Sequence, residues 1–180
     1  MNLILSILLG LLGLIVLLLI VAIFVKKDYS VGREISISKP KQLVFDYLKL
    51  LKNQDNFSKW ALMDPYMRKD FYGTDGTVGF VSSWESNNKN VGQGEQEIKK
   101  ITSGERIDFE IRFIKPFAGV AKATMSTLSV SPNETLVKWG FDSKMKYPMN
   151  LMLLFMNMEK MVGNDLGTGL SNLKNILEKS

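Results

Sequence analysis

The chain has 180 residues, 46% of them hydrophobic, and its 23 basic and 18 acidic side chains give a formal net charge of +5. It contains no cysteine and no histidine, which excludes disulfides, thiolate catalysis and the commonest general base and metal ligand. The basic residues are interleaved with acidic ones, so we expect no nucleic-acid partner. This length fits one N-terminal segment and one globular domain of about 150 residues.

The N-terminal segment is long enough to cross a membrane. Leu3 to Val25 form 23 residues without a charge, and as a helix they would extend over about 35 Å. The first two residues carry no basic side chain and no small-residue cleavage site precedes Lys26, so the pattern favours a retained anchor over a cleaved signal peptide. The sequence predicts a transmembrane anchor over residues 1–27, in the membrane through residues 3–25, and a globular domain over 28–180.

The charges beside this segment predict its orientation. Lys26 and Lys27 both follow the apolar run, and basic residues flanking a membrane span favour the cytoplasmic side. We therefore expect a single-pass membrane protein with its N-terminus outside and its globular domain in the cytoplasm.

The globular domain begins with a strand and two helices. Apolar and polar side chains alternate from Tyr29 to Ile37, which indicates a half-buried strand that only Arg33 interrupts. Ser38-Lys-Pro40 is typical of a helix start, and a second short helix is expected over residues 53–61. The first helix carries its apolar residues on one face: Leu43, Val44, Tyr47, Leu48 and Leu51.

A run of about six antiparallel strands follows. Glycines punctuate the strand-like runs, and the turn Ser131-Pro-Asn-Glu134 separates the last two. In one run Ile107, Phe109, Ile111 and Phe113 alternate with charged residues, so one face is buried and the other is wet. The expected strands include residues 80–85, 94–101, 106–114, 118–130 and 135–143.

A long helix is expected to close the chain. Its second half has a single apolar stripe of Leu166, Leu170, Leu173 and Leu177. Its first half, residues 147–162, holds five of the ten methionines and is apolar on nearly every side. A second membrane span is disfavoured there, because polar side chains such as Asn150 and Glu159 interrupt the run. The stretch is then either a buried core helix or a helix with one side on a cavity.

The order of elements is strand, two helices, about six strands and a long helix. Several short motifs accompany this order: Ser38-Lys-Pro40, Trp60, Gly79 with Trp84, Val91-Gly-Gln-Gly-Glu95, Phe113-Ile-Lys-Pro-Phe117, Trp139 and Gly169-Leu-Ser-Asn-Leu-Lys174. In this order they resemble the SRPBCC superfamily of START-related, polyketide cyclase/dehydrase and lipid transport-like proteins over roughly residues 29–179. The resemblance implies an α+β helix-grip fold, in which a curved antiparallel sheet wraps around the C-terminal helix and encloses a cavity for hydrophobic small molecules.

Candidate site residues come from the expected concave face and from the methionine-rich stretch. We assign no catalytic residue, no cofactor and no metal ligand. Gly92-Gln-Gly94 is interpreted as strand punctuation and not as a phosphate loop, because Glu97 occupies the third glycine position. The candidate ligand-cavity residues are Trp84, Phe109, Ile111, Phe113, Trp139, Phe141, Met152, Phe155 and Met156.

Three functions are compatible with the sequence. The leading one is a membrane-anchored binding module for a lipid or other hydrophobic small molecule. The second is an enzyme that resembles polyketide cyclases or dehydratases, with Tyr72, Glu95 and Glu97 as candidate proton-transfer groups. The third is an interaction protein of the membrane surface with a filled core, whose protein partners the sequence does not identify.

Overall fold

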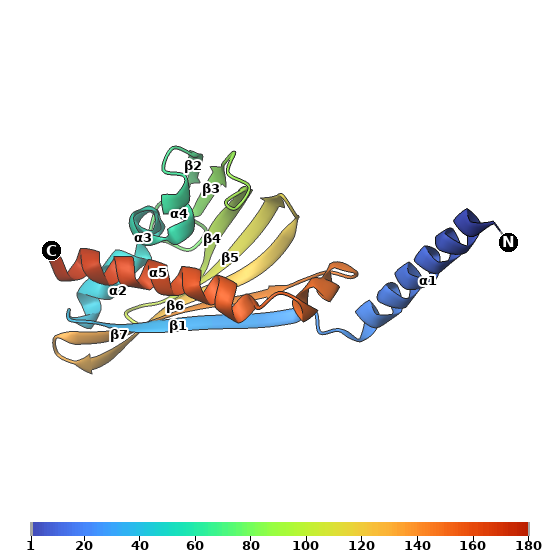
Figure 1. Ribbon diagram of the computed structural model, residues 1–180. Coiled ribbons are helices and arrows are strands. Elements are labelled where there is room, and N and C mark those ends of the chain that lie inside the picture. The colour runs from blue at the N-terminus through green and yellow to red at the C-terminus, as the bar shows by residue number, and fades with distance from the viewer. Residues whose placement is uncertain (1, 180) are drawn as a thin grey trace.

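We describe a computed structural model of the chain for residues 2–179. One long apolar α-helix precedes a strand, three short α-helices with a 3-10 helix among them, six further strands, a second 3-10 helix and a long C-terminal α-helix (Figure 1). The elements are α1 (Leu3–Phe24), β1 (Asp28–Ile37), α2 (Lys41–Lys49), the 3-10 helix η1 (Leu51–Asn53), α3 (Gln54–Phe57), α4 (Lys59–Met63), β2 (Arg68–Tyr72), β3 (Val81–Glu85), β4 (Gln93–Thr102), β5 (Arg106–Lys115), β6 (Gly119–Ser131), β7 (Glu134–Lys144), the 3-10 helix η2 (Met149–Leu154) and α5 (Met158–Lys179).

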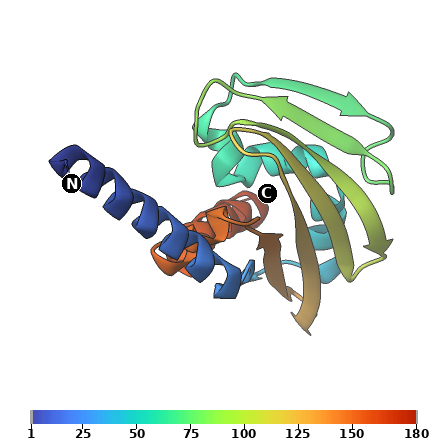
Figure 2. The same cartoon turned by 90° about the vertical axis from the view of Figure 1, so that its right-hand side faces the viewer.

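The seven strands form one antiparallel sheet in the order β1-β7-β6-β5-β4-β3-β2. The chain runs as a meander from β2 to β7, and β1 pairs with β7 at the end of the series. The sheet curves, and α5 lies across its concave side with α3 and α4 beside it (Figure 2). This is the α+β helix-grip fold, which confirms the predicted fold class.

The core lies between the concave face and α5. Ile107 and Phe109 of β5 are buried as their alternation predicts, and Leu170 and Leu173 of the helix stripe are buried opposite the sheet. Gly169 lets the helix come close, because a Cβ atom there would lie 2.6 Å from the ring of Trp139. Glycine in this helix therefore serves close packing.

Arg33 interrupts the alternation of apolar and polar residues in β1, because its side chain contacts α5. Its guanidinium donates hydrogen bonds to the Glu159 carboxylate and, at 3.0 Å, to the Glu159 carbonyl oxygen. A Cβ atom on Gly163 would lie 2.1 Å from the same guanidinium, so the arginine occupies the space that this glycine leaves. The charged residue on the apolar face thus joins the first strand to the first turns of the last helix.

The two ends of the sheet are different in kind. One end of the sheet contains the first residues of β1 and β6, Asp28 and Gly119, and the last residues of β5 and β7, Lys115 and Lys144. We call it the proximal end, because α1 leaves the domain there (Figure 1). The helix α5 runs from the proximal end to the opposite, distal end, where α2 also lies.

The methionine-rich stretch is not the helix that we expected. Residues 149–154 form the 3-10 helix η2. Residues 155–157 are not helical, and α5 begins only at Met158. The Asn157 side chain accepts a hydrogen bond of 2.9 Å from the backbone N–H of Lys160, which is the geometry of a helix N-cap. A new helix therefore starts after Asn157, and the expected continuous helix over this stretch is corrected.

The helix α1 extends away from the domain and is exposed along nearly its whole length, with only Ala22 buried among its described residues. It is the one helix between residues 2 and 179 that is long and apolar enough to cross a membrane.

Candidate functional site

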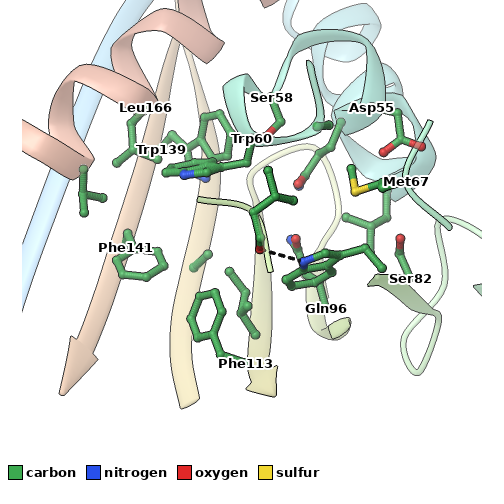
Figure 3. A pocket seen from close by; sticks show the side chains of 18 of the residues that line it. Asp55, Ser58, Trp60, Met67, Ser82, Gln96, Phe113, Trp139, Phe141 and Leu166 are labelled. Carbon is green, nitrogen blue, oxygen red and sulfur yellow. Dashed lines mark hydrogen bonds between the residues drawn. The ribbon is translucent and has the colours of Figure 1, made fainter. Parts of the chain in front are cut away.

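A cavity of about 310 Å³ lies between the concave face of the sheet, α5 and the short helices α3 and α4 (Figure 3). Its volume is at the lower end of the range found for small-molecule sites. The lining residues are Tyr29, Leu51, Gln54, Asp55, Ser58, Trp60, Ala61, Met67, Lys69, Ser82, Trp84, Asn90, Val91, Gln96, Ile111, Phe113, Ala123, Trp139, Phe141, Val162 and Leu166.

The cavity lies toward the proximal end of the domain. Tyr29 is the second residue of β1, and Phe113 and Phe141 are close to the ends of β5 and β7. Val91 belongs to the loop before β4, at the same end of the sheet. The cavity is therefore in the part of the domain that is joined to α1.

Aromatic rings form much of the wall. Trp139 makes edge-on contacts with Phe57, at a centroid distance of 5.7 Å, and with Trp60, at 6.3 Å. Trp84 meets Phe113 edge-on at 6.3 Å. The chain has three tryptophans, and all three line this cavity. An apolar or aromatic ligand would meet rings on both sides.

The position of Trp84 depends on a glycine and a hydrogen bond. Its indole N–H donates to the Val91 carbonyl oxygen over 3.2 Å, the bond that Figure 3 marks with a dashed line. A Cβ atom on Gly94 of the neighbouring strand would lie 2.7 Å from the Trp84 ring. The ring can lie against the sheet only because residue 94 has no side chain.

A group of polar side chains lies along one side of the cavity, opposite Phe113, Trp139 and Phe141 (Figure 3). Lys69 Nζ and Asp55 Oδ1 form an ion pair over 2.5 Å. Gln54 is buried, and its Nε2 atom has no hydrogen-bond partner. The polar residues that line the cavity include Gln54, Asp55, Ser58, Lys69, Ser82, Asn90 and Gln96.

Three of the lining residues have ionisable side chains, and they give the cavity few groups that could transfer a proton. The Asp55 carboxylate is neutralised by Lys69. Burial raises the pKa of the Tyr29 hydroxyl, which a hydrogen bond with Ser143 offsets in part. No group of three or more carboxylates that could hold a metal ion occurs within residues 2–179. The site can enclose an apolar molecule and donate or accept a few hydrogen bonds.

Five of the candidate residues that we chose from the sequence line this cavity: Trp84, Ile111, Phe113, Trp139 and Phe141. Phe109 is on the same face but lies in the closed part of the core, 2% exposed. Met152, Phe155 and Met156 are not among the lining residues, because the chain breaks before α5 and places them outside the domain's interior. Their placement on a cavity-facing helix side is corrected accordingly.

The side of the cavity built by α3 and α4 was not predicted from the sequence. Gln54 and Asp55 belong to α3, and Ser58 lies between the two helices, which are too short to show a periodic pattern. Trp60 was the available signal, since a large aromatic residue on so short a helix must be covered by something.

The carboxylates considered for proton transfer lie outside the cavity. Glu95, Glu97 and Glu110 surround the Arg112 guanidinium, which donates to Glu97 over 2.7 Å and to Glu110 over 2.6 Å. Hydrogen bonds from Lys99 and Arg112 lower the pKa of the Glu97 carboxyl, the opposite of what a general acid needs. Tyr72 is also exposed and away from the cavity.

The fold and the cavity define the class: this is a helix-grip protein whose sheet and C-terminal helix enclose a largely apolar cavity. No known family's sequence profile matches the chain, and no curated protein matches it. Its similarity to known proteins is therefore one of structure, at low sequence identity.

Solved structures with this fold include proteins of different kinds. Truncated norcoclaurine synthase from Thalictrum flavum is 7% identical, with 87% of this chain and 97% of that chain covered and a TM-score of 0.61. The same enzyme in complex with dopamine and hydroxybenzaldehyde is 8% identical, with coverages of 89% and 92% and a TM-score of 0.58. The Aha1 dimer from Colwellia psychrerythraea is 14% identical, with coverages of 83% and 96% and a TM-score of 0.57.

Proposed function

We propose that the protein is a membrane-anchored binding module for a lipid or another hydrophobic small molecule, held in the cavity between the sheet and α5. The observation that carries this proposal is the cavity itself: about 310 Å³, walled by tryptophan and phenylalanine rings, with one polar side. Sites of this composition suit a ligand with an apolar body and a small polar group.

The anchoring part of the proposal rests on α1. Its 22 residues carry no charge, are mostly apolar and are nearly all exposed, and an apolar surface of this size is unfavourable in water. We propose that residues 1–27 anchor the chain and that residues 28–180 form the cytoplasmic domain, with Lys26 and Lys27 on the cytoplasmic side. The cavity would then stay close to the bilayer, where apolar ligands are concentrated.

An enzyme is the second candidate, and the observation that favours it is the presence of one carboxylate, Asp55, among the lining residues of the cavity. Norcoclaurine synthase, which has the same fold, is an enzyme by name. The binding module remains the better supported function, because the one carboxylate of the cavity is already neutralised by a lysine. A reaction would need a free acid or base in contact with the substrate.

Filling the cavity from one strand tests the binding function. Ser82 of β3 lines the cavity, whereas the adjacent Ser83 points to the other face of the strand and donates a hydrogen bond to the Asp70 carbonyl oxygen. We expect an apolar molecule to copurify with the parent protein and with Ser83→Phe, and to be absent from Ser82→Phe. Mass spectrometry of organic extracts measures this directly. Equal amounts of every apolar species in the two variants would overturn the proposal.

A further inference from the structure

A second apolar surface lies outside the cavity, on the segment between β7 and α5. Leu154 is 57% exposed and Phe155 is 84% exposed, while Leu153 lines a groove with residues of α1. Met149 and Met152 of the same segment are also exposed. Exposure of several adjacent apolar side chains to water is unfavourable, and such a surface marks a site of interaction. We call residues 149–155 the apolar segment.

The apolar segment is fastened to the last turns of α1. The Asn150 side chain is fully buried, and its Nδ2 atom donates to the carbonyl oxygens of Ala22, at 2.7 Å, and Val25, at 3.0 Å. These carbonyls lie at the C-terminal end of the helix, where the backbone lacks intrahelical donors. Tyr147 adds a longer contact of 3.4 Å from its hydroxyl to the Leu19 carbonyl oxygen.

These contacts set the depth of the segment relative to the helix. Leu19 to Val25 covers about 9 Å of helix axis, and Ala22, the one buried residue of α1 among those described, lies in the middle of this stretch. If α1 crosses a bilayer, its last two turns lie at the boundary between hydrocarbon and headgroups. The apolar segment must lie at the same depth.

The charges around the segment fit this position. Lys27 accepts a backbone hydrogen bond of 2.9 Å from Met145, which places Lys146 beside the lysines that follow α1. Lysines next to an apolar surface are typical of the membrane interface, where their ammonium groups meet anionic headgroups.

We propose that residues 149–155 form an interfacial membrane element, in which Leu154 and Phe155 insert into the leaflet that α1 leaves, and which holds the proximal end of the domain against the bilayer. This inference rests on the proposed membrane anchoring by α1 and does not depend on the cavity's ligand. Its partner is the lipid bilayer itself, and a second protein chain is the alternative that the experiment must separate.

The absence of cysteine makes the test direct, because single cysteines can be introduced for spin labelling without removing any. Phe155→Cys and Leu154→Cys are compared with Leu128→Cys, an exposed apolar position of β6 near the distal end, 61% exposed. The full chain is reconstituted into vesicles of phosphatidylcholine and phosphatidylglycerol. Accessibility of the labels to oxygen and to a water-soluble nickel chelate is then measured.

We expect labels at positions 154 and 155 to show an oxygen-to-nickel accessibility ratio several-fold higher than the label at position 128. The ratio should be unchanged when Ser82→Phe is added, which separates this inference from cavity binding. Equal ratios at the three positions in vesicle-bound protein would overturn the proposal. Labels at 154 and 155 that are inaccessible to both reagents would indicate that a second protein chain covers the segment. Protein that fails to float with the vesicles would show that α1 does not anchor the chain. Either result would also overturn the proposal.

Discussion

At the scale of single residues, glycines shape the cavity because they leave room for the tryptophan rings that line it. Gly94 makes room for the Trp84 ring and Gly169 makes room for Trp139. The sequence could indicate that these tryptophans and Phe113 face inward, since alternation along a strand predicts the face. It could not indicate Gln54 or Lys69, because long-range packing brings these residues to the cavity.

Adding a methyl group at Gly94 should displace the Trp84 ring. A Cβ there would lie 2.6 Å from the Arg112 carbonyl oxygen and 2.7 Å from the ring, so Gly94→Ala should cost about 1–3 kcal/mol. We expect a lower melting temperature and a shifted tryptophan emission. Gly119→Ala is the control, since no atom lies within 4 Å of a Cβ at that position. Equal effects of the two changes would contradict the assigned packing of Trp84.

The charge cluster around Arg112 should make stability depend on acid pH. The pKa of the Glu97 carboxyl is lowered in the folded state from its ordinary value of 4.5, mainly by hydrogen bonds from Lys99 and Arg112. Its stabilising contribution is therefore present above pH 4.5 and is lost as the pH falls through the lower folded-state pKa. Glu97→Gln should cost on the order of 1 kcal/mol at neutral pH, and the deficit should disappear in acid. Urea unfolding at a series of pH values measures this, and a deficit that does not change with pH would argue against the assignment.

At the scale of elements, the strands and the second half of α5 follow their hydrophobic patterns, whereas the segment between β7 and α5 does not. Alternation predicted β5 and the leucine stripe predicted α5, because each has one wet face. The methionine-rich stretch has no wet face, so its pattern could not separate a helix from an irregular segment. Asn157 was the missed signal, as an N-cap residue inside an expected helix.

Truncations in these two halves should differ in cost. Leu173 is fully buried, so Leu173→Ala should lower the free energy of unfolding by about 2–5 kcal/mol. Met152 is 38% exposed and lies outside the core, so Met152→Ala should change it by about 0.5 kcal/mol or less. Thermal unfolding of both variants checks this. Similar losses of unfolding free energy in the two variants would indicate that the methionine-rich stretch belongs to the core.

At the scale of the whole molecule, α1 and the apolar segment lie at the proximal end of the domain, and the C-terminal end of α5 lies at the opposite end (Figure 1). The residues that line the cavity also lie toward the proximal end. This arrangement would place the cavity beside the membrane if α1 crosses it. The sequence predicted the anchor and the domain separately, and it could not reveal their contact, because Asn150 and Ala22 are 128 positions apart.

Removal of residues 1–27 should leave a folded domain, because the sheet and the core do not include α1. The truncated protein should expose Leu153 and the unpaired amide of Asn150, so we expect it to self-associate more than a variant that also carries Leu153→Ser and Leu154→Ser. Circular dichroism and light scattering measure the two effects. A truncated chain without secondary structure would contradict the division at residue 27.

Orientation in the membrane is separately testable with a reporter fused after the last residue. We expect cytoplasmic reporter activity, and replacing Lys26 and Lys27 with serine should weaken that preference. Activity on the outer side in the parent chain would contradict the proposed topology.

Tryptophan quenching tests most directly whether the cavity holds an apolar molecule, since all three tryptophans line the cavity and α1 contains none. The full chain, reconstituted in lipid nanodiscs, is titrated with a brominated fatty acid while tryptophan emission is recorded. We expect saturable quenching in the parent protein and in Ser83→Phe, and its loss in Ser82→Phe. Quenching that is absent, or that rises linearly and equally in all three proteins, would contradict it.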